Sequence, residues 1–281
     1  MADSSRTRET AIIVGAGPIG LACALSAKRR GLDPLVVDAG AIVHSIVRYP
    51  VGMRFFTTPE LLEIGGHPFP CAGEKPTREE ALKYYRGIVR SEGIRVRPYC
   101  RLREAKRVDD GIRCELLEDR GPLVLTCDRL VLATGYFDGP NLLDVPGEDL
   151  PHVSHYYDEG HRSFGRDVVV VGGGNSAAEA ALDLFRAGAR VTVVHRRAEL
   201  KPSVKYWLRP DVENRIRAGE IAARFETGIV RIEPKQIVVR GPAGSEEMLP
   251  ADRVYLLKVS EIFIENGRFD GEKVFADSRA R

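Results

Sequence analysis

The sequence has no long hydrophobic run and almost no net charge. Its apolar stretches, such as residues 168–171, have the length of a β-strand and are far too short to span a membrane. The net charge is only +2, so bulk charge attracts neither nucleic acid nor a membrane surface. The first ten residues are polar and lack the apolar centre of a signal peptide. We therefore expect a cytoplasmic protein with no nucleic-acid or membrane partner.

The chain also lacks any Cys-x-x-Cys pair, although it contains five cysteines. They are Cys23, Cys71, Cys100, Cys114 and Cys127. Their number is odd, and their spacing fits neither a zinc site nor a dithiol redox centre, so we expect no bound metal. We interpret them as reduced thiols, most of them buried as small apolar side chains.

Residues 11–38 contain the clearest motif of the chain. An apolar run at 11–14 is followed by a Gly-rich turn, an Ala-rich segment that ends before Gly31, and a second apolar run that ends at Asp38. The turn reads Gly15-Ala16-Gly17-Pro18-Ile19-Gly20. This order predicts a strand, a tight turn, a helix and a second strand, which is the dinucleotide-binding arrangement.

Each residue type in this turn has a physical role. Gly15 permits the tight turn, Gly17 lets the backbone approach a diphosphate, and Gly20 lets the helix pack closely on the strand. Pro18 suits the first helical turn, where its missing N–H is not needed. The N-terminus of the helix attracts the diphosphate, and the carboxylate of Asp38 can accept both hydroxyls of a ribose.

A later strand, predicted at residues 129–133, ends in Ala133-Thr134-Gly135. A strand that ends in this way returns the chain to the first sheet beside the first Gly-rich turn, which adds these three residues to the same cofactor site. The alternative is an ordinary buried strand and turn.

The opening pattern then repeats after a segment rich in Pro, Gly and Asp at residues 139–160. A run of valines enters a second Gly-rich turn, an Ala-rich helix ends before Gly188, and a strand follows at 190–194. The second turn reads Gly172-Gly173-Gly174-Asn175-Ser176-Ala177, with Ala177 as an accepted variant of the third glycine. The chain therefore contains a second dinucleotide-binding fold.

The two copies differ where the second strand ends. The first copy has Asp38 at this point, whereas the second has His195-Arg196-Arg197. A carboxylate repels a 2′-phosphate, whereas guanidinium groups pair with it. We therefore expect FAD in the first site and NADPH in the second. Lys205 can reach the NADPH phosphates, or it is an ordinary surface lysine.

These motifs, in this order, resemble those of low-molecular-weight thioredoxin reductases, and more closely those of bacillithiol disulfide reductases. Residues 145–151, 158–161, 202–207 and 261–268 share the resemblance, which covers nearly the whole chain. It implies an FAD-containing, NADPH-dependent oxidoreductase that passes hydride from NADPH to FAD and on to a low-molecular-weight disulfide such as bacillithiol disulfide. It also implies a homodimer or a higher homo-oligomer.

The fold class we expect is α/β, with two Rossmann-like, three-layer dinucleotide-binding domains and the NADPH domain inserted in the FAD domain. The FAD domain would take residues 1–145 and 252–281, and the NADPH domain residues 146–251.

The sequence departs from the family pattern at three places. Thioredoxin reductases have a Cys-x-x-Cys pair just before the second Gly-rich turn, where this chain has residues 155–158 without a cysteine. Bacillithiol-type members have a cysteine within the first turn, where this chain has Ile19. Cys23 lies one helical turn further on and is a candidate substitute thiol, or else a small core residue. The family also has several dozen further residues between the positions of residues 257 and 258; this stretch is either truly deleted here or only absent from the given sequence.

Two other classes of function are compatible with the same motifs. A flavin monooxygenase or a ferredoxin-type NADP reductase uses both nucleotide folds and needs no cysteine. A flavin- or NADPH-binding protein without catalytic turnover is the third possibility, and it gains weight if the stretch is truly deleted, because a true deletion would remove part of the flavin site.

Overall fold

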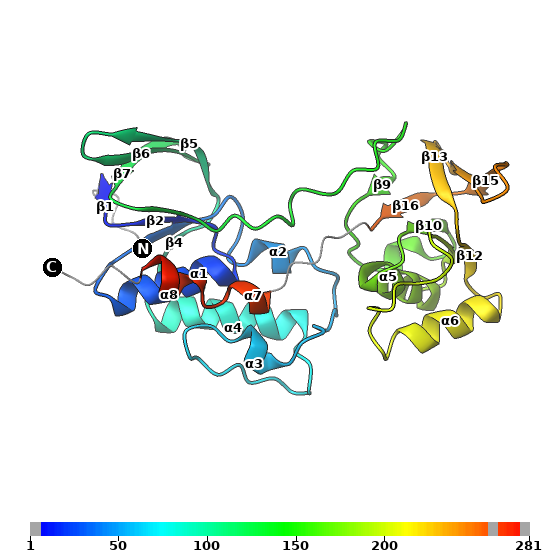
Figure 1. The fold of residues 1–281 in the computed structure, drawn as a ribbon, viewed down its shortest axis with the longest axis horizontal. Coiled ribbons are helices and arrows are strands. Elements are labelled where there is room, and N and C mark those ends of the chain that lie inside the picture. Colours follow the sequence, from blue (N-terminus) through cyan, green and yellow to red (C-terminus); the bar gives the residue numbers. More distant parts are fainter. Residues whose placement is uncertain (1–6, 258–263, 276–281) are drawn as a thin grey trace. The chain divides into compact units, whose positions relative to one another are not determined.

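The chain divides into two compact units, shown as a ribbon in Figure 1. The computed structural model describes residues 7–257 and 264–275. The first unit takes residues 1–48, 52–138 and 262–281, and the second takes 49–51 and 139–261. Each unit contains a parallel sheet with helices on one face and antiparallel strands on the other. This is the α/β class that the sequence predicts.

The parallel sheet of the first unit has the strand order β4-β3-β2-β8. Its strands are β2 (Ile12–Val14), β3 (Leu35–Val37), β4 (Arg95–Arg97) and β8 (Leu130–Leu132). The second sheet has the order β1-β7-β6-β5, with β1 (Arg8–Glu9), β5 (Cys100–Val108), β6 (Gly111–Glu118) and β7 (Gly121–Cys127). The helices are α1 (Pro18–Arg29), α2 (His44–Val47), α3 (Pro59–Leu62), α4 (Arg78–Ser91), α7 (Ile264–Gly267) and α8 (Asp270–Val274).

Side-chain alternation along β2 and β3 joins the layers of this unit. Ile12 and Val14 pack with Leu35, Val37 and apolar residues of the antiparallel strands in one buried cluster. The packed sheet thus supports the turn that follows β2.

Helix α4 begins with the capping box that its sequence predicts. Thr77 accepts a hydrogen bond from the backbone N–H of Glu80, and the Glu80 carboxylate accepts one from the N–H of Thr77.

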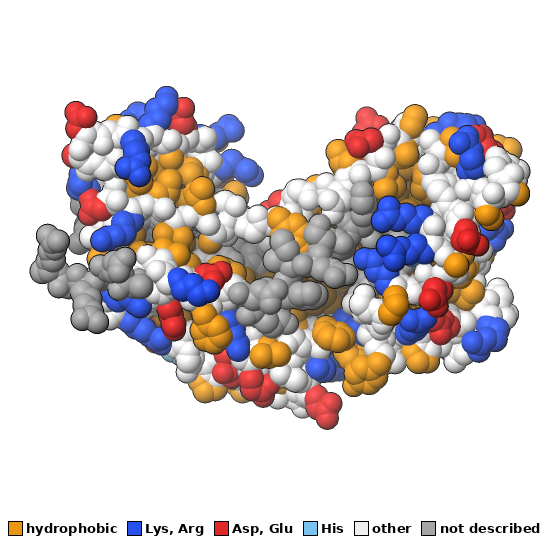
Figure 2. Space-filling view, in the orientation of Figure 1, with side chains coloured by type: hydrophobic (Ala, Val, Ile, Leu, Met, Phe, Trp, Pro, Cys, Tyr) orange, Lys and Arg blue, Asp and Glu red, His pale blue; other side chains and the backbone are white. Residues whose placement is uncertain are grey.

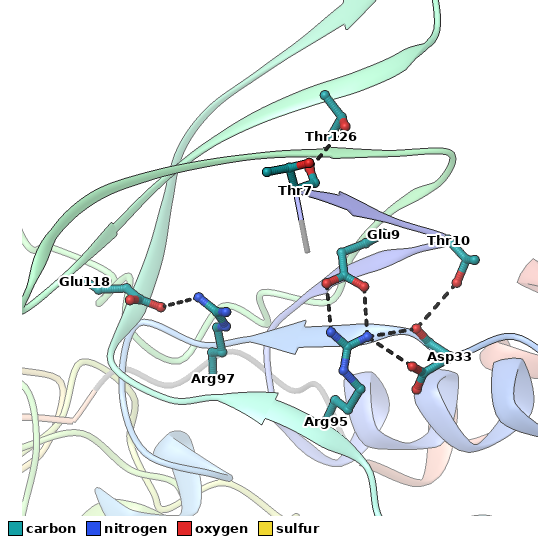
Figure 3. A network of polar contacts seen from close by, with 8 residues as sticks. All are labelled: Thr7, Glu9, Thr10, Asp33, Arg95, Arg97, Glu118 and Thr126. Carbon is teal, nitrogen blue, oxygen red and sulfur yellow. Dashed lines mark hydrogen bonds and ion pairs between the residues drawn. The ribbon is translucent and has the colours of Figure 1, made fainter. Parts of the chain in front are cut away.

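A buried ion-pair network also holds this unit together, as Figure 3 shows. Both guanidinium nitrogens of Arg95 donate to the carboxylate of Glu9, at 2.7 and 2.8 Å, and one of them also lies 3.2 Å from the carboxylate of Asp33. Glu9 is only 3% exposed. A buried carboxylate is stable only when it is paired, so Arg95 ties the short strand β1 to β4.

The parallel sheet of the second unit has five strands in the order β12-β11-β10-β16-β9. They are β9 (Val153–Ser154), β10 (Asp167–Val171), β11 (Arg190–Val194), β12 (Ala222–Arg224) and β16 (Arg253–Leu256). A separate antiparallel sheet contains β13 (Gly228–Glu233), β14 (Gln236–Arg240) and β15 (Glu246–Pro250). The helices are α5 (Asn175–Arg186), α6 (Arg209–Arg217) and the short 3-10 helix His161–Ser163.

The valines of β10 alternate between the two faces of this sheet. Val168 and Val170 pack with the alanines and leucines of α5, whereas Val169 packs with the antiparallel strands. Strand β16 pairs with β10 in the same sheet. The contacts within each unit place the boundaries between the units after residues 138 and 261. The sequence predicts these boundaries after residues 145 and 251. Strand β16 lies in the second unit because its apolar side chains complete that sheet.

The stretch that the family resemblance places between residues 257 and 258 falls beside residues 258–263, which lie outside the described residues. Among the described helices, none is long and apolar enough to cross a bilayer.

Candidate functional site

The first Gly-rich turn is packed so tightly that two of its glycines have no room for a side chain. A Cβ atom on Gly15 would lie 2.2 Å from the carbonyl oxygen of Ala133, and one on Gly20 would lie 1.8 Å from that of Gly15. Gly15 also has a φ of +112°, which other residues rarely adopt. The turn thus brings the end of β8 beside the start of α1, and places Ala133 and Thr134 next to Gly15, as the sequence suggested.

Gly17 is different because the space in front of it is open. A Cβ atom there would meet no atom within 4 Å. Gly17 is the N-cap of α1, and no side chain caps this helix end. The free N–H groups and the positive end of the helix dipole together form a cradle that fits a diphosphate. Pro18 occupies the first helical position, as predicted.

Ile19 packs against α7. Its Cδ1 atom lies 2.9 Å from the position that a Cβ atom on Gly267 of α7 would take. At the position where the resemblance implies a cysteine, the side chain of Ile19 therefore makes an apolar contact between α1 and α7.

Asp38 lies directly behind this turn, at the end of β3. Its Oδ2 atom accepts a hydrogen bond from the backbone N–H of Ala16 at 2.6 Å, and its Oδ1 atom accepts one from the N–H of Gly40 at 2.7 Å. A carboxylate has about four lone-pair positions, so two remain for ribose hydroxyls. Asp38 thus stabilises the turn and keeps acceptors for a nucleotide.

The second Gly-rich turn has the same construction. Gly172 has a φ of +149°, and a Cβ atom there would lie 2.9 Å from the carbonyl oxygen of Leu257 and 3.1 Å from the Cβ of Ala177. These close approaches and the positive φ explain why residue 172 is a glycine. Gly174 is the N-cap of α5, again without a side-chain cap. Ser176 follows in the first turn of α5 and is half-buried.

His195 fills the position behind this turn. It is 6% exposed, and a Cβ atom on Gly173 would lie 2.4 to 2.5 Å from three atoms of its ring. Gly173 is therefore required because the imidazole occupies the space of its side chain. Burial, followed by the charges of Arg197, Arg196 and Lys201, lowers the pKa of His195.

Positive charge gathers on this part of the second unit. Arg196 and Arg197 are exposed, and the Cδ atom of Lys201 lies 3.8 Å from the Cβ position of Gly174. Figure 2 shows a group of Lys and Arg side chains on this face, over α5 and β10. Lys201 was missed in the sequence analysis, although it follows Arg197 by only four residues. A 2′-phosphate and a diphosphate are both suited to such surroundings.

Lys205 and Asn175 hold the segment before α6 onto α5. The ammonium group of Lys205 is paired with the carboxylate of Glu179, and Lys205 is only 4% exposed. The side chain of Asn175 accepts a hydrogen bond from the N–H of Lys205 at 2.7 Å and donates one to the carbonyl oxygen of Ser203 at 3.2 Å. The sequence leaves Lys205 either at the cofactor phosphates or on the surface, and the structure buries it with its ammonium group against Glu179.

The cysteines are mostly buried. Cys23 is 2% exposed and lies under α8, where a Cβ atom on Gly271 would be 2.7 Å from the Cα of Cys23. Burial raises the pKa of its thiol to about 11 and that of Cys127 to about 12. Cys71 is the exception, since it is partly exposed. Within the described ranges, no group of His, Cys, Asp and Glu has the geometry of a metal site.

The fold and the two turns define a protein with two dinucleotide-binding units. The family model of the pyridine nucleotide-disulphide oxidoreductases matches residues 12–257, and the chain belongs to this family. Its members combine a flavin with a pyridine nucleotide, which agrees with the presence of two nucleotide folds.

Individual relatives confirm the predicted resemblance. The chain is 41% identical over 242 residues to bacilliredoxin reductase Bdr of Bacillus subtilis (strain 168), covering 86% of this chain and 73% of that protein. It is 30% identical over 255 residues to a ferredoxin–NADP reductase of Ignicoccus hospitalis, covering 88% and 75%. The solved structure of bacillithiol disulfide reductase Bdr from Bacillus cereus matches with a TM-score of 0.91 at 35% identity, covering 98% of this chain and 99% of that one.

Proposed function

We propose that the chain is an NADPH-dependent flavoenzyme that binds FAD in the first unit and NADPH in the second, and reduces a low-molecular-weight disulfide such as bacillithiol disulfide. One proton, NADPH and one disulfide would yield NADP⁺ and two thiols. The difference between the two equivalent positions carries this assignment, since Asp38 lies behind one turn and His195-Arg196-Arg197 behind the other.

The first unit offers FAD both hydrogen-bond donors and acceptors. The open space at Gly17 and the free N–H groups of α1 would receive the diphosphate, and the remaining lone pairs of Asp38 would accept the ribose hydroxyls. Residues Ala133, Thr134 and Gly135 would complete the site beside Gly15. When bound, FAD supplies a two-electron carrier that accepts hydride from the nicotinamide.

The second unit offers NADPH positive charge in place of the carboxylate. The diphosphate would lie over Gly174 at the start of α5. Arg196 and Arg197 would pair with the 2′-phosphate, and Lys201 would add a third charge near the turn. NADH has no 2′-phosphate for Arg196 and Arg197 to pair with, so we infer a preference for NADPH.

The proposed electron acceptor, a low-molecular-weight disulfide, is inferred from the names of related proteins. Proteins named bacilliredoxin reductase and bacillithiol disulfide reductase match most of this chain at 41% and 35% identity. The second unit lacks the paired cysteines of thioredoxin reductases, so a small disulfide would be reduced without the relay through a protein dithiol. A homodimer or a higher homo-oligomer is part of the same proposal and rests on the family resemblance alone.

Thiol release coupled to NADPH consumption tests the proposal. The purified chain, loaded with FAD, is given NADPH with bacillithiol disulfide, and separately with glutathione disulfide and cystine. We expect two thiols per NADPH with bacillithiol disulfide, and much slower turnover with the other two. NADPH oxidation without thiol release from any disulfide would contradict the proposed acceptor.

A ferredoxin–NADP reductase is the second candidate, favoured by the 30% identity to the Ignicoccus hospitalis protein. Rapid reduction of ferredoxin by NADPH, with no disulfide reduction, would select it. A protein that binds FAD and NADPH but transfers electrons to neither acceptor would be the non-catalytic alternative.

A further inference from the structure

His195 carries a buried nitrogen whose function the described contacts do not explain. The side chain is 6% exposed, and within residues 7–257 and 264–275 its Nε2 atom has no hydrogen-bond partner. Nε2 also lies 2.4 Å from the Cβ position of Gly173, so it points at the turn before α5. Leaving a buried polar atom unpaired costs stability, which suggests that this nitrogen serves a ligand of the turn.

The charged groups around His195 come from several elements. Arg196 and Arg197 follow β11, and Lys201 precedes α6; all three oppose a positive charge on the ring. On the side of β12, the backbone carbonyl of Arg224 accepts a hydrogen bond from the backbone N–H of His195 at 2.9 Å. The guanidinium group of Arg224 is paired with the carboxylate of Glu247 at 2.8 Å.

The loop after β12 completes the surroundings. Glu226 is exposed and donates its backbone N–H to the carbonyl of Arg197, and Thr227 donates its N–H to the carbonyl of His195. The side-chain charges that act on the imidazole are therefore mainly positive. Without a ligand these charges and burial favour the neutral ring.

An anion bound beside His195 would favour the protonated ring over the neutral one. A phosphate monoester carries close to two negative charges at neutral pH, enough to offset most of the positive charge of the three cations. Protonated histidine donates from both ring nitrogens, so the unpaired Nε2 would then have a proton to share with a ligand. A bound anion would therefore favour protonation of the ring, and the unpaired Nε2 would serve as a donor.

We propose that His195 takes up a proton when the 2′-phosphate of NADPH binds among Arg196, Arg197 and Lys201. The inference rests on the proposed function of the second unit and deepens it. His195 then acts as a specificity residue, because NADH brings no phosphate monoester and gains nothing from the proton. Binding and protonation are linked, so each favours the other equally.

The linkage has a definite sign. In the empty site the pKa of His195 is below its ordinary value, and the 2′-phosphate would raise it. At a pH between the pKa of His195 in the empty site and its pKa in the occupied site, His195 takes up as much as one proton when NADP⁺ binds. The affinity for NADP⁺ then falls as the pH rises, by up to about tenfold per pH unit. The 2′-phosphate itself titrates near pH 6 with the opposite effect, so the contribution of His195 must be isolated with a variant.

Calorimetry of the FAD-loaded chain measures the proton uptake that His195 contributes. NADP⁺ and NAD⁺, which differ only in the 2′-phosphate, are titrated at pH 7 in buffers of different ionisation enthalpy, using wild type, His195→Gln and the exposed control His161→Gln. We expect wild type and His161→Gln to take up a fraction of a proton with NADP⁺ that His195→Gln does not. Equal proton uptake in His195→Gln, or equal uptake with NAD⁺, would overturn the inference.

A second readout needs no variant. The ring resonances of His195 in the wild-type chain, assigned through its backbone, are titrated by NMR with and without NADP⁺. A higher pKa with NADP⁺ supports the proposal, and an unchanged pKa overturns it. If NADP⁺ does not bind at all, the proposed NADPH site fails and the inference falls with it, which distinguishes the two failures.

Discussion

Asp38 accepts a hydrogen bond from the backbone N–H of Ala16 at 2.6 Å, and the equivalent place in the second unit is filled by the ring of His195 against Gly173. One residue behind each turn therefore decides the shape of the turn and the charge that a nucleotide meets there. In the first unit this is a carboxylate with free lone pairs, and in the second a neutral ring beside arginines. This exchange is the basis on which we propose different cofactors for the two units.

Replacing Asp38 tests the first unit. In Asp38→Asn one acceptor oxygen becomes an NH₂ group that faces the N–H of Ala16 or Gly40. Removing such a hydrogen bond to a charged group costs about 1.5–3 kcal/mol, so we expect FAD affinity to fall at least tenfold. The flavin absorbance that remains after gel filtration measures this. Asp119→Asn, in an exposed turn, should retain full flavin, and retention in both variants would contradict the assignment.

Glycine replacements separate binding from folding. Gly17 has open space and an ordinary φ of −72°, so Gly17→Ala should fold normally and bind FAD poorly, because the new methyl group fills the space for the diphosphate. Gly174→Ala should likewise fold and lose NADP⁺ affinity, since its nearest neighbour is 3.8 Å away. Gly20→Ala places a Cβ atom 1.8 Å from a carbonyl oxygen and should fail to fold. Thermal melting and cofactor titration distinguish these outcomes.

The arginine pair determines the expected preference for NADPH. Loss of two charge-assisted contacts in Arg196→Ala/Arg197→Ala should lower kcat/KM for NADPH about 100-fold. The value for NADH should change by less than about threefold, because it has no 2′-phosphate to pair. Arg166→Ala, an exposed arginine of the same unit, provides the control. An equal loss with both nucleotides would show that the pair supports the fold rather than cofactor choice.

The ion pair drawn in Figure 3 makes a prediction about stability. Arg95→Ala leaves the carboxylate of Glu9 buried without its main partner, which costs about 3–5 kcal/mol. Urea unfolding measures the difference. Arg101→Ala, on an exposed strand position, should change the free energy of unfolding by less than about 0.5 kcal/mol. Similar values for the two variants would refute a stabilising role of the buried pair.

The cysteines differ in reactivity. At pH 8 a thiol with a pKa of about 11, such as that of Cys23, is ionised in about one molecule in a thousand. Iodoacetamide should therefore label Cys71 in the native chain and leave Cys23 unmodified, as mass spectrometry can show. Cys23→Ser should accordingly retain reductase activity. Labelling of Cys23 together with loss of activity would instead support Cys23 as a substitute for the family cysteine that is absent at Ile19.

The parts of this structure that the sequence predicts are local. The turn around Gly15 and Gly20 and the capping box of Thr77 and Glu80 depend on residues within a few positions of one another, so their spacing alone indicates the geometry. The two parallel sheets follow from repeats of strand, turn and helix.

Contacts between distant residues carry no such signal. Arg95 and Glu9 are 86 positions apart, and Lys205 pairs with Glu179 across 26; nothing in the neighbouring sequence identifies either partner. Its positive charge and its place after the second turn therefore make Lys205 a candidate for the phosphates, whereas its pairing with Glu179 appears only in the structure. Strand β16 joins the second sheet for an equally non-local reason, its pairing with β10.

The reductive half-reaction tests the central claim most directly. The FAD-loaded protein is mixed anaerobically with NADPH, and separately with NADH, while the flavin absorbance is recorded. We predict rapid bleaching by NADPH and much slower bleaching by NADH. A flavin that neither nucleotide reduces, or a chain that retains no flavin at all, would contradict the proposal that this protein passes hydride from NADPH to FAD.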